Sequence, residues 1–282
     1  AFLSPPSPEV IRFSVGQPDF DTPQPVVDEL KAALDRGETT YTRTQGSVEL
    51  CQAVATHLAN HNITADPQDV VITPGCKQAI LYAMMATLDA GDEVLVLSPA
   101  WPSYDGMLKL LNYVPVHVQV RRDNYHPDFN ALESAVTGKT KAIMLNSPNN
   151  PTGAVYTPEE IEQLLEFAKK HDLWILDDMI YATLAWTDYP YTSPSSLPGG
   201  EERTITIGGW SKGWAMTGWR MGWITGPKRV MDGVKKINVS AATHVATFIM
   251  PAAAVALTLH EETEMMAASF KERRGIIHGL LK

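Results

Sequence analysis

The stretch Gly208–Gly222, which reads GGWSKGWAMTGWRMG, carries a lysine and an arginine eight residues apart. Lys212 follows a β-branched run at residues 204–207 that predicts a buried strand, so it is expected just beyond a strand end, where ligands gather in open α/β sheets. Neighbouring tryptophans would partly remove its amine from water, which lowers the pKa and favours the neutral form that attacks an aldehyde. Arg220 can hold a phosphate through two parallel hydrogen bonds. An aldehyde and a phosphate on one ligand suggest pyridoxal phosphate (PLP).

Taken alone, the same stretch also fits a purely structural role. Ser211 and Lys212 could begin a helix on the surface, and Arg220 could be an ordinary ion-pair partner. The interpretation therefore depends on whether other elements of the chain bring further polar groups to the same place.

The composition is that of a globular protein, with 44% apolar and 20% charged residues in a chain of 282. A net charge of −9 argues against a nucleic-acid backbone as the partner. No apolar run reaches the roughly 18 residues that a membrane helix needs, and the first residues do not resemble a signal peptide. Two cysteines are too few for a disulfide framework. We therefore expect a cytoplasmic protein with one large domain and no membrane, nucleic acid or metal ion as a partner.

The central part of the chain alternates between apolar strand-like runs and helical patterns. This rhythm predicts a mostly parallel sheet with helices on both faces and right-handed crossovers. The expected strands are residues 70–73, 93–97, 114–120, 141–145, 173–176, 204–207 and 221–225. The expected helices are residues 24–37, 47–61, 78–88, 104–111, 128–136 and 158–170, followed by a helical region from Arg229 onward.

Polar residues follow four of the predicted strands. They are Gly75-Cys76-Lys77, Asn150 in an NPTG turn, Asp178 with Tyr181, and Lys212 with Arg220. The first group begins a helix, whose free N–H groups and positive dipole end can hold an anion. Each signal alone has an ordinary explanation as a turn or a helix cap. Their joint occurrence at the carboxyl ends of strands is what predicts a binding site.

Together these motifs resemble the class I and II aminotransferases of PLP fold type I. GQPDF, PNNPTG, DxxY and SKxxxMTGWRxG occur in the family's order, over nearly the whole chain. The resemblance implies an α/β fold with a mostly parallel seven-stranded sheet between helices and a small domain largely absent from this chain. It also implies an N-terminal segment (1–25) belonging to the small domain, a large PLP-binding domain (26–260) and the start of an interdomain helix (261–282).

The resemblance assigns roles around the cofactor ring. Lys212 would bond to PLP and move the proton between the substrate's α-carbon and the cofactor. Asp178 would pair with the pyridine nitrogen and keep it protonated. Asn150 and Tyr181 would hydrogen-bond the phenolate oxygen, and Trp101 would lie against the ring face, although burial in the core is an alternative for Trp101.

The resemblance also implies which residues bind the cofactor phosphate and the substrate. Arg220 and the backbone at Cys76 and Lys77 would grip the cofactor phosphate, with Tyr41 reaching over from a second subunit. Such sharing predicts a homodimer with active sites near its two-fold axis. Gly16 would lie close to the substrate's carboxylate, where a side chain would collide.

Three departures from the family pattern stand out. The sequence ILDDMIY offers two aspartates, and only Asp178 stands three residues before Tyr181, whereas Asp177 falls on the preceding strand position and Met179 replaces the usual glutamate. Ala100 precedes Trp101 where relatives often carry an aromatic residue. Family members continue well beyond Lys282, and that part would supply the arginine for the substrate's α-carboxylate.

The sequence thus predicts a PLP-dependent aminotransferase that exchanges an amino group between an L-amino acid and a 2-oxo acid by a ping-pong mechanism. Two alternatives stay open: a PLP-dependent lyase or decarboxylase on the same fold, and a PLP-binding domain without catalysis. The visible residues do not determine the amino donor.

Overall fold

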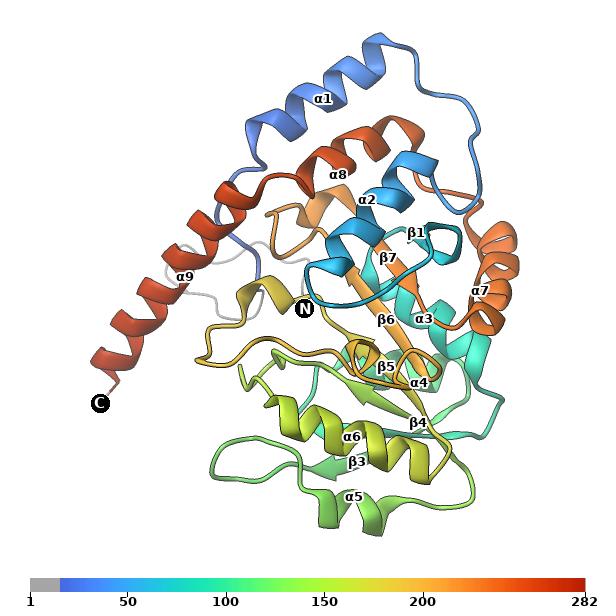
Figure 1. The fold of residues 1–282 in the computed structure, drawn as a ribbon, viewed down its shortest axis with the longest axis vertical. Coiled ribbons are helices and arrows are strands. Elements are labelled where there is room, and N and C mark those ends of the chain that lie inside the picture. Colours follow the sequence, from blue (N-terminus) through green and yellow to red (C-terminus); the bar gives the residue numbers. More distant parts are fainter. Residues whose placement is uncertain (1–15, 282) are drawn as a thin grey trace, which may run out of the picture.

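A seven-stranded sheet lies at the centre of the computed structural model, which describes residues 16–281 (Figure 1). Residues 1–15 of the predicted N-terminal segment lie outside the described residues. The strand order is β1-β7-β6-β5-β4-β2-β3. The strands are β1 (Val71–Thr73), β2 (Glu93–Ser98), β3 (Val114–Gln119), β4 (Thr140–Leu145), β5 (Trp174–Asp178), β6 (Thr204–Gly209) and β7 (Gly222–Thr225).

Most neighbouring strands of this sheet run parallel, which confirms the predicted α/β fold. Only β7 is antiparallel to its neighbours, β1 and β6. The other six strands therefore end at the same edge, and β7 begins there. This edge brings together the residues that follow β1, β4, β5 and β6. Arg220 and Met221, which precede β7, lie at the same edge.

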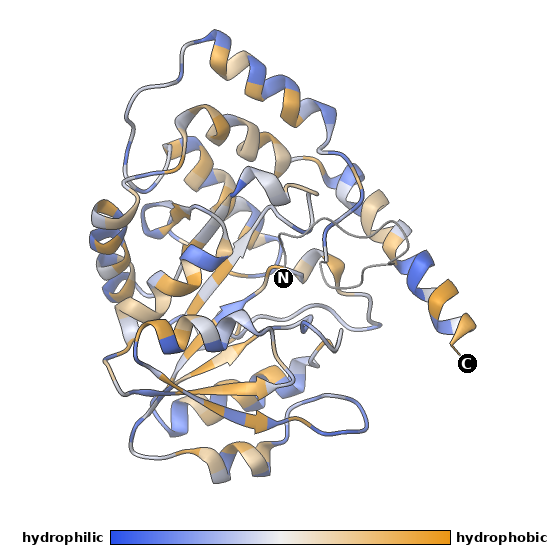
Figure 2. Ribbon diagram, turned by 180° about the vertical axis from the view of Figure 1, so that it is seen from behind, coloured by the Kyte–Doolittle hydropathy of each residue, from blue (hydrophilic) through white to orange (hydrophobic). Residues whose placement is uncertain are grey.

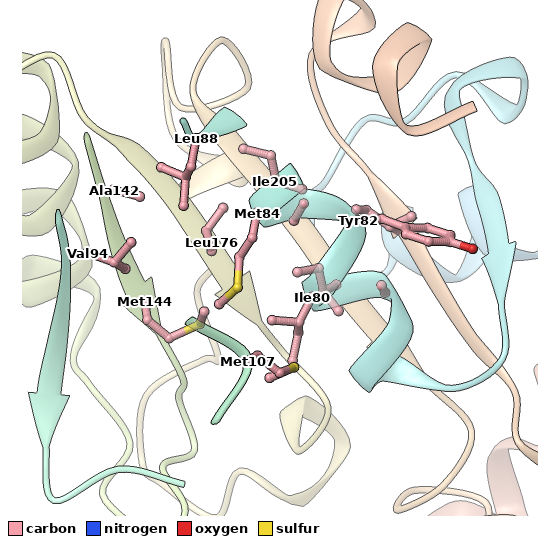
Figure 3. Packing of buried hydrophobic residues seen from close by; sticks show 14 of the residues in the cluster. Ile80, Tyr82, Met84, Leu88, Val94, Met107, Ala142, Met144, Leu176 and Ile205 are labelled. Atoms are coloured by element: carbon pink, nitrogen blue, oxygen red, sulfur yellow. The ribbon is translucent and has the colours of Figure 1, made fainter. Parts of the chain in front are cut away.

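Helices cover both faces of the sheet, as the nearly continuous burial of the central strands requires. Val94 and Val96 of β2 pack in one apolar cluster with residues of α3, α4 and α7. Figure 3 shows this cluster around Met84 and Leu176. Leu95 and its alternate neighbours point the other way, into a cluster with α5 and α6. The bounds are α3 (Cys76–Thr87), α4 (Ser103–Leu110), α5 (Phe129–Ala135), α6 (Pro158–Lys170) and α7 (Lys228–Ala241).

A third apolar cluster lies beside the sheet and fixes the loop after β6. It joins α1 (Gln24–Asp35), α2 (Val48–Ala59) and α8 (Met250–Ala256) to the loop tryptophans. Trp210 is fully buried, and its Nε1 donates to the carbonyl of Ala253 at 2.9 Å. The last helix, α9 (His260–Leu280), extends away from this cluster (Figure 1).

Local signals placed several helix starts correctly. The helix expected over residues 158–170 is α6, and a capping box formed by Thr157 and Glu160 begins it. Ser47 caps α2 by accepting from Leu50 N at 3.1 Å. Helix α3 begins at Cys76, two residues before the predicted start, so Cys76 and Lys77 form its first turn. Among the described residues, five short 3₁₀ helices lie at Pro67–Asp69, Ala182–Leu184, Pro194–Ser196, Thr217–Trp219 and Thr247–Ile249.

Hydrophobic residues are concentrated along the strands (Figure 2). Within residues 16–281, no helix is both long and apolar enough to cross a membrane.

Candidate active site

A cavity of about 1150 Å³ opens at the edge where the parallel strands end. All the predicted site residues except Tyr41 line it: Gly16, Cys76, Lys77, Trp101, Asn150, Asp178, Tyr181, Lys212 and Arg220. The structure therefore brings together residues from loops that are far apart in the sequence.

Lys212 lies in the turn after β6, held by the buried Trp210 two residues earlier. Its Nζ donates to the carbonyl oxygen of Gly16 and lies 5.9 Å from the ring centre of Tyr181. Partial burial lowers the pKa of the Lys212 amine, against a smaller opposing influence of Cys76. A lowered pKa increases the fraction of neutral amine, which is the form that acts as a nucleophile or a base.

Asp178 ends β5 and is only 3% exposed. Its Oδ2 accepts a hydrogen bond from the Tyr104 hydroxyl at 2.7 Å, and its Oδ1 accepts from Ile180 N at 3.3 Å. Burial raises the pKa of Asp178 to about 6, although both hydrogen bonds favour the charged form. The site therefore holds a carboxylate that is ready to accept a cation or a proton.

Sequence reasoning missed Tyr104, although one signal pointed to it. Tyr104 follows Trp101 by three residues at the start of α4, a spacing that places two side chains on neighbouring positions of a turn. Their rings meet edge to face, with centroids 5.4 Å apart. A polar aromatic residue one turn after a predicted cofactor-stacking tryptophan could have been proposed as a partner of the same site.

Asp177 points to the opposite side of β5. It is 1% exposed, and its Oδ2 accepts from the hydroxyl of Ser193 at 2.5 Å. Burial raises the pKa of Asp177 to about 7, opposed by the Ser193 hydrogen bond. Asp178 lines the cavity and Asp177 does not. Of the two aspartates, the geometry thus presents only Asp178 to a ligand.

A second residue missed from the sequence, Asn146, connects the loops that follow β4 and β5. It is buried, its Nδ2 donates to the carbonyl of Asp178 at 2.8 Å, and its Oδ1 accepts from Asn150 N at 2.8 Å. Asn150 in turn extends its Nδ2 to the Tyr181 hydroxyl at 3.5 Å. Asn146 thereby fixes the relative positions of Asp178, Asn150 and Tyr181 without itself being charged.

The start of α3 forms a cradle for an anion together with Arg220. Gly75 precedes the helix with φ +82°, and a Cβ on it would lie 2.7 Å from Nη2 of Arg220. Within residues 16–281, the backbone N–H groups of Cys76 and Lys77 donate to no other group. Arg220 has a left-handed backbone and donates from Nη1 to Thr217 O at 2.9 Å. Free N–H groups, a helix dipole and a guanidinium suit a phosphate.

Trp101 and Lys77 contact each other on the wall of the cavity. Trp101 is partly buried at the edge of an apolar cluster, so it combines core packing with a face on the cavity. The ammonium of Lys77 lies 5.0 Å from the centre of its ring. The side chain of Lys77 therefore lies against Trp101, and Lys77 contributes its backbone N–H, in the first turn of α3, to the anion cradle.

Tyr41 lies outside the cavity, on the loop between α1 and α2. It is 89% exposed, and its ring meets that of His244 edge to face with centroids 5.6 Å apart. Its predicted place in a second subunit's site stays a prediction. Arg274 of α9, which the sequence did not single out, also lines the cavity.

Comparisons with known proteins agree with this geometry. Residues 8–282 match the family model of aminotransferase class I and II. The chain is 39% identical to an aspartate aminotransferase of Thermotoga maritima, covering 97% of this chain and 72% of that protein. It is also 39% identical to an aromatic-amino-acid aminotransferase of Thermococcus litoralis, covering 95% and 70%. The solved aromatic aminotransferase of Pyrococcus horikoshii superposes with a TM-score of 0.90 at 39% identity, over 93% of this chain and 72% of that one.

Proposed function

This chain belongs to the class I and II aminotransferase family, and we propose that it exchanges an amino group between an L-amino acid and a 2-oxo acid with PLP as its cofactor. The observation that carries the proposal is that a single cavity contains Lys212, whose amine has a lowered pKa, the buried carboxylate of Asp178, and an anion cradle. Two half-reactions on one site give the ping-pong order. We place this activity in amino-acid metabolism.

PLP, when bound, supplies an aldehyde that accepts an amino group and a ring that draws electrons from the substrate's α-carbon. Lys212 would hold the cofactor through Nζ and then take a proton from the α-carbon of the amino acid. Its lowered pKa supports this role because a base must be unprotonated when it acts. The centre of the Tyr181 ring lies 5.9 Å from this amine.

Asp178 would hold a proton on the cofactor's ring nitrogen. The carboxylate is buried and fixed by the Tyr104 hydroxyl and Ile180 N, so it cannot rotate freely away from a ligand. A positively charged ring nitrogen would favour the ionised form of Asp178, opposing the pKa increase that burial causes in this structure.

The anion cradle would bind the cofactor phosphate. Arg220 contributes the guanidinium, and Cys76 and Lys77 contribute backbone N–H groups at the start of α3. Gly75 is required beside them because a larger residue would displace the guanidinium. This grip would place the cofactor ring toward Asp178 and Lys212, which line the same cavity.

The remaining cavity residues would orient the ring and the substrate. Asn150 and Tyr181 would donate to the phenolate oxygen, and Trp101 would lie along a ring face. Gly16, whose carbonyl accepts from Lys212, would lie near the incoming substrate. Binding of substrate would then compete with this Lys212–Gly16 contact.

We further propose a homodimer in which Tyr41 completes the phosphate site of the neighbouring subunit. Its 89% exposure, outside its own cavity, supports this role. A reducing cytoplasm suits the protein because neither Cys51 nor Cys76 forms a disulfide. Residues 26–260 would form the large domain, with residues 1–25 and the interdomain helix from residue 261 leading into a small domain that would supply the substrate-carboxylate arginine.

The cofactor assignment can be tested by chemical trapping. Protein loaded with PLP is treated with borohydride, which reduces a carbon–nitrogen double bond to a stable secondary amine, and the peptides are analysed by mass spectrometry. The adduct is expected on Lys212, and the Lys212→Ala variant should carry none. An adduct confined to another lysine, such as Lys77, would refute the assignment.

A further inference from the structure

The loop that carries Tyr41 leaves this side chain without a packed environment of its own. Tyr41 is 89% exposed, whereas the aromatic residues of the cavity wall are buried or partly buried. A freely rotating side chain loses conformational entropy when it binds, which weakens binding. A residue that holds Tyr41 in its binding orientation beforehand would therefore strengthen the contact it makes.

His244, on the segment between α7 and α8, is placed to do this. Its ring meets the Tyr41 ring edge to face at an interplanar angle of 82°. Its Nε2 lies 3.4 Å from the backbone N of Thr42, the next residue along the loop. Its Nδ1 lies 2.7 Å from the carbonyl oxygen of Val245. His244 thus contacts both the Tyr41 side chain and the adjoining backbone.

These two hydrogen bonds determine the tautomer of the imidazole. The carbonyl of Val245 can only accept, so Nδ1 of His244 must carry a proton. The N–H of Thr42 can only donate, so Nε2 must offer its lone pair. The two hydrogen bonds therefore fix the orientation of the ring from both sides.

Two other hydrogen bonds hold the ends of the loop that carries Tyr41. The hydroxyl of Thr247 donates to Glu38 O at 2.6 Å, and Asn238 Nδ2 donates to Thr44 O at 2.5 Å. His244 lies between these two donors in the sequence, and it acts on the middle of the loop. Loss of the His244 side chain would thus free Tyr41 while the loop ends stay attached.

We propose that His244 is a positioning residue that orients Tyr41 for the cofactor phosphate of the neighbouring subunit. This rests on the proposed dimer and on the proposed role of Tyr41. It makes a specific statement about geometry: a change at His244 in one subunit affects the cofactor site of the other. A residue that only stabilises its own subunit would not have this effect.

Hybrid dimers test this statement directly. Two differently tagged chains are co-expressed, and the mixed dimer is isolated by both tags. In the first hybrid, one chain carries His244→Ala and its partner chain carries Lys212→Ala. In the second hybrid, one chain is unaltered and its partner chain carries both substitutions. Each hybrid contains the same two substitutions and one lysine-bearing cofactor site.

The readout is the dissociation constant of PLP at that lysine-bearing site, followed by the absorbance of the lysine-bound cofactor. The first hybrid receives Tyr41 from a chain with His244 intact, so its affinity should equal that of a hybrid carrying Lys212→Ala alone. The second receives Tyr41 from the altered chain and should bind PLP roughly tenfold more weakly. Equal affinities, or a weaker first hybrid, would overturn the proposal.

Tyr41→Phe in the same two arrangements separates this inference from the proposed function. If Tyr41→Phe has no effect in either hybrid, or if the protein is monomeric, the shared site itself is wrong. If Tyr41→Phe weakens the second hybrid and His244→Ala does not, only the role of His244 is wrong. A His244→Phe variant keeps the ring contact and loses both hydrogen bonds. In the second arrangement its PLP affinity should lie between that with an intact His244 and that with His244→Ala.

Discussion

The hydroxyl of Tyr104 donates a 2.7 Å hydrogen bond to Oδ2 of Asp178, and both side chains are buried. Tyr104 lies at the start of α4 and Asp178 at the end of β5, on elements 74 residues apart in the sequence. A buried carboxylate without such a donor would hold its proton more tightly. The bond therefore keeps Asp178 available as an anion inside the cavity.

Removal of this donor should weaken cofactor binding in a pH-dependent way. In Tyr104→Phe the carboxylate loses a hydrogen bond, so the pKa of Asp178 rises above its value of about 6. PLP affinity, titrated between about pH 5 and pH 8, should fall roughly tenfold at pH 6 and less at pH 8. Tyr113→Phe is the matched control, because Tyr113 belongs to the same apolar cluster and does not line the cavity. An unchanged pH dependence in Tyr104→Phe would contradict this role.

Asp177 should affect stability rather than cofactor binding. Burial raises its pKa to about 7 in the folded protein, above the value of about 3.9 in an unfolded chain. The stability that this group contributes is thus present below about pH 4 and is lost as the pH rises through about 7. The asparagine of Asp177→Asn does not titrate, so the variant escapes this loss. The free energy of unfolding of the variant minus that of the unaltered protein should therefore be greater at pH 8 than at pH 4, by on the order of a few kcal/mol.

Urea unfolding at the two pH values measures this difference. Asp21→Asn, at an exposed position, serves as the control and should show no comparable change. The Asp177→Asn variant should also bind PLP as the unaltered protein does. A large loss of PLP affinity in this variant would show that the wrong aspartate has been assigned to the cofactor.

Gly75→Ala should damage the anion cradle specifically. The added methyl group would lie 2.7 Å from Nη2 of Arg220 and push the guanidinium away. PLP affinity should decrease roughly tenfold or more, which corresponds to the free energy of one hydrogen bond to a charged group. Gly91→Ala is the control: its φ is also positive, +91°, and no atom lies within 4 Å of the added group.

Both glycine variants should also lose about 1 to 3 kcal/mol of stability, because φ is positive at both positions and an alanine is strained there. Only Gly75→Ala should lose affinity for PLP, measured by equilibrium titration of the cofactor-free protein. Equal affinities of the two variants would mean that Arg220 does not contribute to the phosphate site.

The sequence predicted those parts of the structure that depend on local signals. Helix α6 has the predicted bounds, because Thr157 and Glu160 form a capping box and Pro158 fixes the first turn. The start of α3 was placed two residues too late, since Gly75 provides no side-chain cap at all. Asp178 was chosen over Asp177 because only Asp178 stands three residues before Tyr181, as the family pattern requires. In the structure the two carboxylates lie on opposite sides of β5, because side chains alternate along a strand.

Tyr104 and Asn146 could not be assigned in the same way. Their importance arises from contacts between elements: α4 packs beside the end of β5, and the loop after β4 lies against Asp178. The spacing of Tyr104 from Trp101 could have placed it near the site, but no local pattern encodes its hydrogen bond to Asp178 or that of Asn146. The position of Tyr41 against His244 belongs to the same class, because their loops are about 200 residues apart in the sequence.

In the proposed function, this protein moves amino groups through PLP held at Lys212. The most direct measurement is the absorbance spectrum of the PLP-loaded protein before and after single L-amino acids are added, followed by a 2-oxo acid. We expect at least one amino acid to convert the cofactor to its pyridoxamine form with release of a 2-oxo acid, and an added 2-oxo acid to restore the original spectrum. A spectrum that no amino acid changes, or ammonia release without conversion of the cofactor, would contradict transamination.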